Sequence, residues 1–131
     1  MDNGSSGRLV NHEESEASLT SALNYSQSLT DLGRYQEPKS LLRTKLPVAR
    51  RVYGESHDLT LRMRSLYARA LCEDAGATLD DLREAVTSLE DSGRTARRVF
   101  GGAHPLTTAI GIFLRKARAA RDARETPPRR A

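Results

Sequence analysis

Few residues of this 131-residue chain could perform catalysis or bind a metal ion. His57 and His104 have no Cys, Asp or second His at the i, i+4 spacing of a helical metal site. Cys72 has no His near it in the sequence that would activate its thiol, which indicates a buried, inert side chain. The neighbouring carboxylates in Glu73-Asp74 and Asp80-Asp81 point about 100° apart on a helix, so they cannot converge on one substrate. We therefore predict no enzyme activity, no metal site and no cofactor.

Both histidines belong to a segment that occurs twice. Residues 50–60 recur as residues 97–107, with seven of the eleven positions identical and a shift of 47 residues. A second correspondence pairs Leu32-Gly33 with Ala75-Gly76 at a shift of 43, and an insertion after Gly76 accounts for the difference. Self-similarity at such a period is typical of stacked structural repeats. Repetition also explains why the histidines occupy equivalent turns, and we expect each to have a structural role at a helix start.

The elements that position these residues are predicted to be helices. Apolar residues recur at a spacing of three or four in five stretches, and no stretch alternates with a period of two. Glycine favours the conformation that ends a helix, so we expect the first four helices to end at Gly33, Gly54, Gly76 and Gly101. Pro105 is expected in the first turn of the fifth helix, where a missing amide hydrogen costs nothing.

Local signals also mark helix starts and irregularities. Asp58 is the expected N-cap of the third helix, and Thr78 with Asp81 resembles a capping box at the start of the fourth. Pro47 removes an amide donor inside the second helix and is expected to kink it. Gly93 is expected to bend the fourth helix without ending it.

The two ends of the chain have a different composition from its middle. Residues 1–15 are rich in Gly, Ser and acidic side chains, and residues 122–131 include Thr-Pro-Pro-Arg-Arg, so we predict disorder at both ends and a folded domain over residues 16–121. The longest stretch without Asp, Glu, Lys or Arg, residues 99–114, is too short to span a bilayer, and the first residues do not form a secretory signal. A single cysteine excludes an internal disulfide and indicates a reducing compartment. We expect a cytoplasmic protein that does not interact with membranes.

The order of these motifs resembles the long tetratricopeptide repeat of kinesin light chains. The residues that carry the resemblance are Leu23-Asn24, Leu32–Glu37, Arg51–His57 and Val99–Pro105. The resemblance covers about residues 17–120 and implies an all-α fold of helical hairpins, with about two and a half repeats in five helices stacked as a right-handed superhelix. Pro38 and Pro47 depart from the pattern, and the heptad coiled coil of a light chain is absent. We interpret the chain as a repeat fragment or a short stand-alone module.

The resemblance also implies a binding site. In this architecture the first helices of each pair line a concave groove that holds a peptide segment of a partner, which is the role of a scaffold or adaptor. The expected groove residues are Ser21, Asn24, Ser28, Arg64, Tyr67, Arg115 and Arg118. Amide side chains hold a peptide backbone and arginines hold carboxylates, so an acidic extended peptide is the natural ligand.

The distribution of charge leaves two alternatives open. The net charge is +4, but residues 94–131 contain 10 basic and 2 acidic side chains, a local charge of +8. This segment could bind nucleic acid or another polyanion through phosphate contacts, which are weak and depend on salt. The module could also be a structural unit that forms a homodimer through exposed repeat ends, because stacked repeats usually need about three units for stability.

Overall fold

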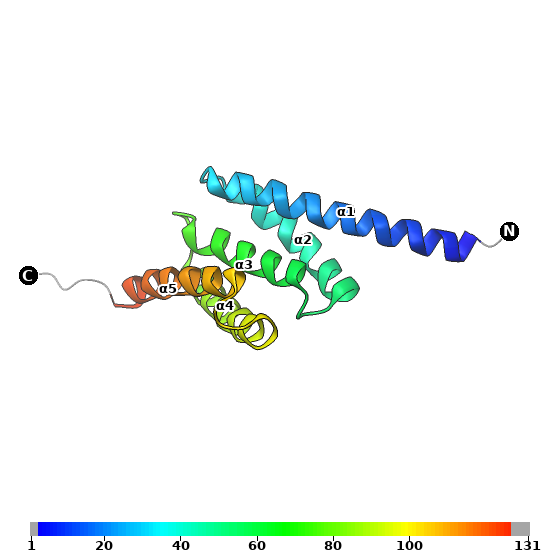
Figure 1. Cartoon of the computed structure of the whole chain (residues 1–131). Helices are drawn as coiled ribbons and strands as arrows, with labels where there is room; N and C mark the ends of the chain where they lie inside the picture. Colours follow the sequence, from blue (N-terminus) through cyan, green and yellow to red (C-terminus); the bar gives the residue numbers. More distant parts are fainter. Residues whose placement is uncertain (1–2, 127–131) are drawn as a thin grey trace, which may run out of the picture.

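A computed structural model describes residues 3–126 of the chain, with side chains from residue 16 onward, and this part contains five helices and no strand (Figure 1). The helices are α1 (Asn3–Asp31), α2 (Gln36–Tyr53), α3 (Asp58–Glu73), α4 (Leu79–Phe100) and α5 (Pro105–Glu125). The prediction of five helices with breaks near Gly33, Gly54, Gly76 and Gly101 is confirmed. None of the helices in residues 3–126 has the length and apolarity that a membrane span needs.

Helix α3 occupies the centre of the arrangement. It packs against all four other helices, whereas within residues 3–126 neither α1 and α5 nor α2 and α4 come into backbone contact. Nine of its sixteen residues are buried, which is more than one apolar stripe would require. Helices α1, α3 and α5 therefore follow one another on one side, with α2 and α4 on the other (Figure 1).

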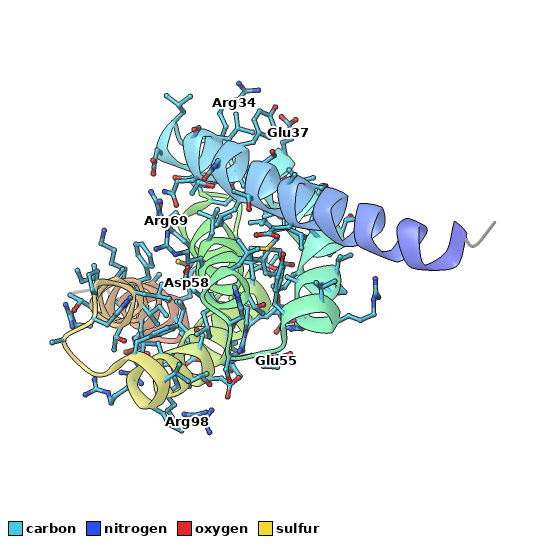
Figure 2. All side chains as sticks on the ribbon, turned by 45° about the vertical axis from the view of Figure 1, so that its right-hand side comes forward. Arg34, Glu37, Glu55, Asp58, Arg69 and Arg98 are labelled. Carbon is cyan, nitrogen blue, oxygen red and sulfur yellow. The ribbon has the colours of Figure 1, made fainter. Side chains whose placement is uncertain are left out.

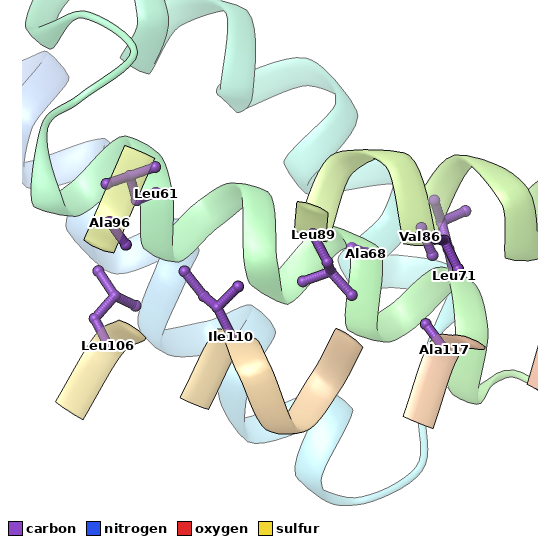
Figure 3. Packing of buried hydrophobic residues seen from close by; sticks show 10 residues of the cluster. Leu61, Ala68, Leu71, Val86, Leu89, Ala96, Leu106, Ile110 and Ala117 are labelled. Atoms are coloured by element: carbon purple, nitrogen blue, oxygen red, sulfur yellow. The ribbon is translucent and has the colours of Figure 1, made fainter. Parts of the chain in front are cut away.

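Two clusters of buried apolar side chains hold the helices together. One joins α1, α2 and α3, and the other joins α3, α4 and α5. In Figure 3 the side chains of Leu61, Leu89 and Ile110, from three different helices, point into this second cluster. Gly93 lets α4 approach α5 closely, because a Cβ at this position would lie 3.3 Å from Cγ2 of Ile110. Both α4 at Gly93 and α2 at Pro47 continue as single helices.

The duplicated sequence segment forms the same turn twice. Gly54 (φ 88°, ψ 169°) and Gly101 (φ 92°, ψ 159°) have almost identical backbone angles, in a region that side chains with a Cβ avoid. The amide of Gly54 donates to the carbonyl of Arg50 at 2.9 Å, and the amide of Gly101 donates to that of Arg97 at 3.0 Å. The shift of 47 residues therefore relates equivalent positions of the structure.

The histidines of this segment are helix caps. Nδ1 of His57 accepts a hydrogen bond from the amide of Leu59, and Nδ1 of His104 accepts one from the amide of Leu106, both at 3.1 Å. Each imidazole also packs on the aromatic ring four residues earlier, with centroids 4.5 Å apart in the first copy and 4.7 Å apart in the second. The expected structural role is confirmed. The prediction of Asp58 as the cap of α3 is wrong, because Asp58 is already helical and its carboxylate pairs with the side chain one turn later.

Helix α4 starts with the predicted capping box. The hydroxyl of Thr78 accepts a hydrogen bond from the amide of Asp81 at 3.1 Å, and the carboxylate of Asp81 accepts one from the amide of Thr78 at 3.0 Å. Two amides that the helix leaves without carbonyl partners are thereby satisfied, and the start of α4 is set by local sequence.

The helices at the two ends are longer than predicted. Helix α1 includes residues 3–15, which we expected to be disordered, and Figure 1 shows this part extending beyond the other helices. Arg8, Leu9, Glu13 and Glu14 of this segment are residue types that favour a helix. At the other end residues 122–125 are helical, because Arg124 donates to the carbonyl of Ala77 and Glu125 pairs with Arg83 at 3.1 Å. The rest of the predicted tail, residues 127–131, lies outside the described residues.

Candidate binding grooves

The seven predicted groove residues do not share one surface. Asn24 lines a hollow of about 310 Å³ between α1 and α5, with α3 as its floor. We call it the α1/α5 groove; it is lined by Leu23, Asn24, Gln27, Arg62, Ser65, Pro105, Leu106, Ala109 and Phe113.

Arg64 and Tyr67 belong to a second hollow, of about 670 Å³, between α2 and α4 on the opposite side of α3. We call it the α2/α4 groove; it is lined by Arg43, Leu46, Pro47, Arg50, Arg64, Tyr67, Arg83, Glu84, Thr87, Ser88, Asp91 and Arg94.

The other predicted residues lie elsewhere. Arg118 borders a smaller hollow of about 220 Å³ between α4 and α5. Ser21, Ser28 and Arg115 are exposed and line none of these three hollows.

The predicted residues are divided between two grooves because the sequence interpretation assigned the wrong face of α3 to the side of Asn24. Residues two positions apart on a helix point about 200° apart, so Arg62 and Arg64 face opposite sides of α3. The α3 residues that share a groove with Asn24 are Arg62 and Ser65, which the sequence interpretation did not select. The sequence did not indicate that Arg64 is buried, because arginine is usually exposed.

In the α1/α5 groove one wall carries amide side chains and the other is apolar. Asn24 and Gln27 are exposed and about one turn apart on α1, and Nε2 of Gln27 donates to Asp31 at 3.0 Å. The opposite wall comes from α5 and includes Leu106, Ala109 and Phe113.

The arginines beside this groove already have partners in the chain. Arg62 pairs with Asp58 at 3.0 Å. Arg69 pairs with Asp31 and with Glu73, both at 2.9 Å, and its guanidinium lies 5.5 Å from the centroid of the Phe113 ring. A ligand of this groove therefore does not need acidic side chains.

In the α2/α4 groove Arg64 connects α3 to its neighbours. Its side chain is only 7% exposed; Nη2 donates to Asp91 at 2.8 Å, and Nη1 lies 3.5 Å from Glu55. Its Nε is buried and has no hydrogen-bond partner among the described residues. The hydrogen bond from Arg64 lowers the pKa of Asp91 below its usual range. The predicted peptide clamp is thus a buried guanidinium that binds α4.

Arg43 is a residue of the α2/α4 groove that sequence reasoning missed. Its Nε and Nη2 donate to the hydroxyl oxygen of Tyr67 at 3.3 and 3.2 Å, and its guanidinium lies 5.9 Å from the centroid of that ring. The signal was the spacing on α2, where Arg43, Pro47 and Arg50 follow one another on one face.

Several arginines near the C-terminal end of the described chain are held by intramolecular bonds. Arg118 pairs with Glu90 at 2.9 Å, and Arg121 pairs with Asp122 at 3.0 Å. Arg124 donates to the carbonyl of Ala77. Because these arginines already have partners in the chain, α5 has fewer arginines available to a polyanion than the local charge of +8 indicates.

The described residues include no group of three or more His, Cys, Asp or Glu side chains that could hold a metal ion. Burial raises the pKa of the Cys72 thiol to about 11, so the thiol is neutral near pH 7. Comparisons with protein-family models, with curated proteins and with solved structures gave no match to this chain.

Proposed function

We propose that this chain is a tetratricopeptide-like interaction module of the cytoplasm that binds a peptide segment of a partner protein in the α1/α5 groove. The two equivalent turns at Gly54 and Gly101 support the repeat architecture, because they begin α3 and α5 in the same way. A right-handed superhelix is the arrangement expected of such repeats. The proposed role is that of a scaffold or adaptor.

The composition of the groove carries this proposal. A primary amide donates and accepts hydrogen bonds at once, so Asn24 and Gln27 can bind an N–H and a carbonyl of an extended peptide. The apolar wall on α5, which includes Phe113, can receive a side chain of the same peptide. We expect a peptide with an apolar side chain and no requirement for acidic residues.

Selection of peptides from a random displayed library, followed by calorimetry, tests the proposal. The double variant Asn24→Ala/Gln27→Ala should weaken binding about 5-fold or more, because each lost hydrogen bond costs about 0.5–1.5 kcal/mol. Ser21→Ala is the matched control, since Ser21 is exposed on the same helix and lines none of the three hollows. Peptides that bind the double variant and the native protein equally, at equal helix content, would place the site elsewhere.

The alternative of self-assembly through the α5 end has less support. Leu61, Ala68 and Leu71 of α3 are buried in the cluster shared with α4 and α5. If a further helix packed on α5 in the way that α4 packs on α3, α5 would need apolar residues at the positions equivalent to Leu61, Ala68 and Leu71. The repeat shift places these positions 47 residues later in the chain. The residues at those positions are exposed and polar, namely Thr108, Arg115 and Arg118. A polar outer face is typical of a helix that caps a repeat stack.

A further inference from the structure

We propose a second binding site in the α2/α4 groove, on the opposite side of α3, for an acidic segment of a partner protein. It does not depend on the α1/α5 groove. The lining contains five arginines against two carboxylates, those of Glu84 and Asp91. A concave surface of this composition attracts anionic ligands and increases their association rate.

Arg43 is the anchor of the proposed site. Among the described residues it is the groove arginine without a carboxylate in salt-bridge distance, and its hydrogen bonds go to the phenol of Tyr67. No described residue accepts a hydrogen bond from the hydroxyl of Tyr67, so its hydrogen is available. A guanidinium and a phenol side by side offer two donors to the two oxygens of one ligand carboxylate.

The second position of the site is Arg50. It pairs with Glu55 at 3.0 Å, and both side chains are substantially exposed, at 42% and 58%. Exposed ion pairs contribute little to stability, so a ligand carboxylate can replace Glu55 at small cost. Arg64, in contrast to Arg50, does not contact the ligand in this proposal, because its guanidinium is buried and paired with Asp91.

The spacing of the two exposed arginines defines the ligand. Arg43 and Arg50 are seven residues apart on α2, which is about 10 Å along the helix axis. A peptide in the extended polyproline II conformation advances about 3.1 Å per residue and has three residues per turn, so two acidic residues three positions apart point to the same side and cover about this length. The ligand that fits is an extended segment with acidic side chains at i and i+3.

The opposite wall favours a peptide over a nucleic acid. Glu84, Thr87 and Ser88 of α4 supply acceptors that backbone N–H groups of a peptide can use, whereas a phosphodiester backbone has no such donors and is repelled by the carboxylate. The aromatic ring in the groove, that of Tyr67, has the Arg43 guanidinium beside it and does not offer an open platform for base stacking.

Fluorescence anisotropy with three labelled probes tests the site. The probes are a ten-residue Gly/Ser peptide with Glu at two positions three apart, the same peptide with Gln in place of Glu, and a ten-nucleotide oligouridine. We expect the Glu peptide to bind at least 10-fold more tightly than the Gln peptide. Arg43→Glu should reduce its affinity at least 10-fold, and Tyr67→Phe should also reduce it about 10-fold or more, because a hydrogen bond to a charged carboxylate contributes about 1.5–3 kcal/mol.

Arg98→Glu is the matched control for charge. Arg98 is exposed on α4, does not line the groove, and points outward at the edge of the molecule (Figure 2). Its replacement should change the affinity less than about 3-fold, because only distant electrostatic attraction is lost. Asn24→Ala/Gln27→Ala should leave this binding unchanged, which separates the site from the α1/α5 groove.

Three results would overturn the proposal. Equal losses for Arg43→Glu and Arg98→Glu would mean that net charge alone attracts the peptide. Tighter binding of oligouridine, with the same dependence on Arg43, would assign the groove to nucleic acid. Concentration-dependent self-association in analytical ultracentrifugation that Arg43→Glu abolishes would mean that a second copy of the chain occupies the groove.

Discussion

The variant Asp91→Asn should destabilise the fold by about 1–1.5 kcal/mol, because it removes the charge that faces the buried guanidinium of Arg64. Asn has nearly the same shape and helix propensity as Asp, so the change isolates the charge. The Asn oxygen can still accept the hydrogen bond from Nη2 that now measures 2.8 Å.

The magnitude follows from the surroundings of the pair. A hydrogen bond to a charged group contributes about 1.5–3 kcal/mol and a neutral one about 0.5–1.5 kcal/mol. Arg64 has one other acidic neighbour, Glu55, at 3.5 Å, which compensates little for the loss. Subtracting the neutral contribution from the charged one leaves a loss of about 1–1.5 kcal/mol. Asp91 is 54% exposed, so water screens part of the interaction and the loss should not exceed this range.

Urea unfolding followed by circular dichroism at 222 nm measures the effect. With a typical slope of about 2 kcal/mol per molar urea, the midpoint should fall by about 0.5–0.8 M at pH 7. The pair also predicts a pH dependence. The fold lowers the pKa of Asp91, so the stability from ionised Asp91 is present above its unfolded pKa, about 3.9, and is lost as the pH falls through the lower folded value. The native protein and Asp91→Asn should therefore converge in stability once the pH is below the lowered pKa of Asp91.

Glu84→Gln is the control for this experiment. Glu84 is exposed on the same helix and has no ion pair among the described residues, so the change should stay within about 0.5 kcal/mol. If Asp91→Asn is no more destabilising than Glu84→Gln, Arg64 does not depend on Asp91 for its burial, and the electrostatic reasoning for this groove is refuted.

Other parts of the fold give further predictions. His104→Ala should lower the stability of the fold by about 1 kcal/mol, because it removes the cap on the amide of Leu106, and thermal unfolding would detect the change. Gly93→Val should destabilise by about 1–3 kcal/mol, since a Cβ already lies 3.3 Å from Cγ2 of Ile110; an unchanged melting temperature would show that α4 and α5 separate easily. Cys72 should react with iodoacetamide at pH 8 much more slowly in the native protein than in concentrated urea, because burial raises its pKa to about 11.

The sequence alone determined how many helices form and where the turns between them lie, but the full lengths of α1 and α5 were not predicted. Gly54 and Gly101 need a conformation that other residues avoid, and Thr78 and Asp81 satisfy amides within three residues of themselves. The duplicated histidines likewise bond amides two residues away. Such interactions involve neighbours in the chain, so the residue types and their order contain the required information.

The tertiary structure decided which residues face each other. Helix α3 is covered on several sides, so its buried positions do not define one apolar stripe, and the side that Arg64 and Tyr67 face could not be read from periodicity. The contact between Arg43 and Tyr67 joins residues 24 positions apart, and that between Arg64 and Asp91 joins residues 27 positions apart. The grooves exist because α2 and α4, and likewise α1 and α5, pack on α3 without meeting, and that depends on how side chains from distant segments fill the space between helices.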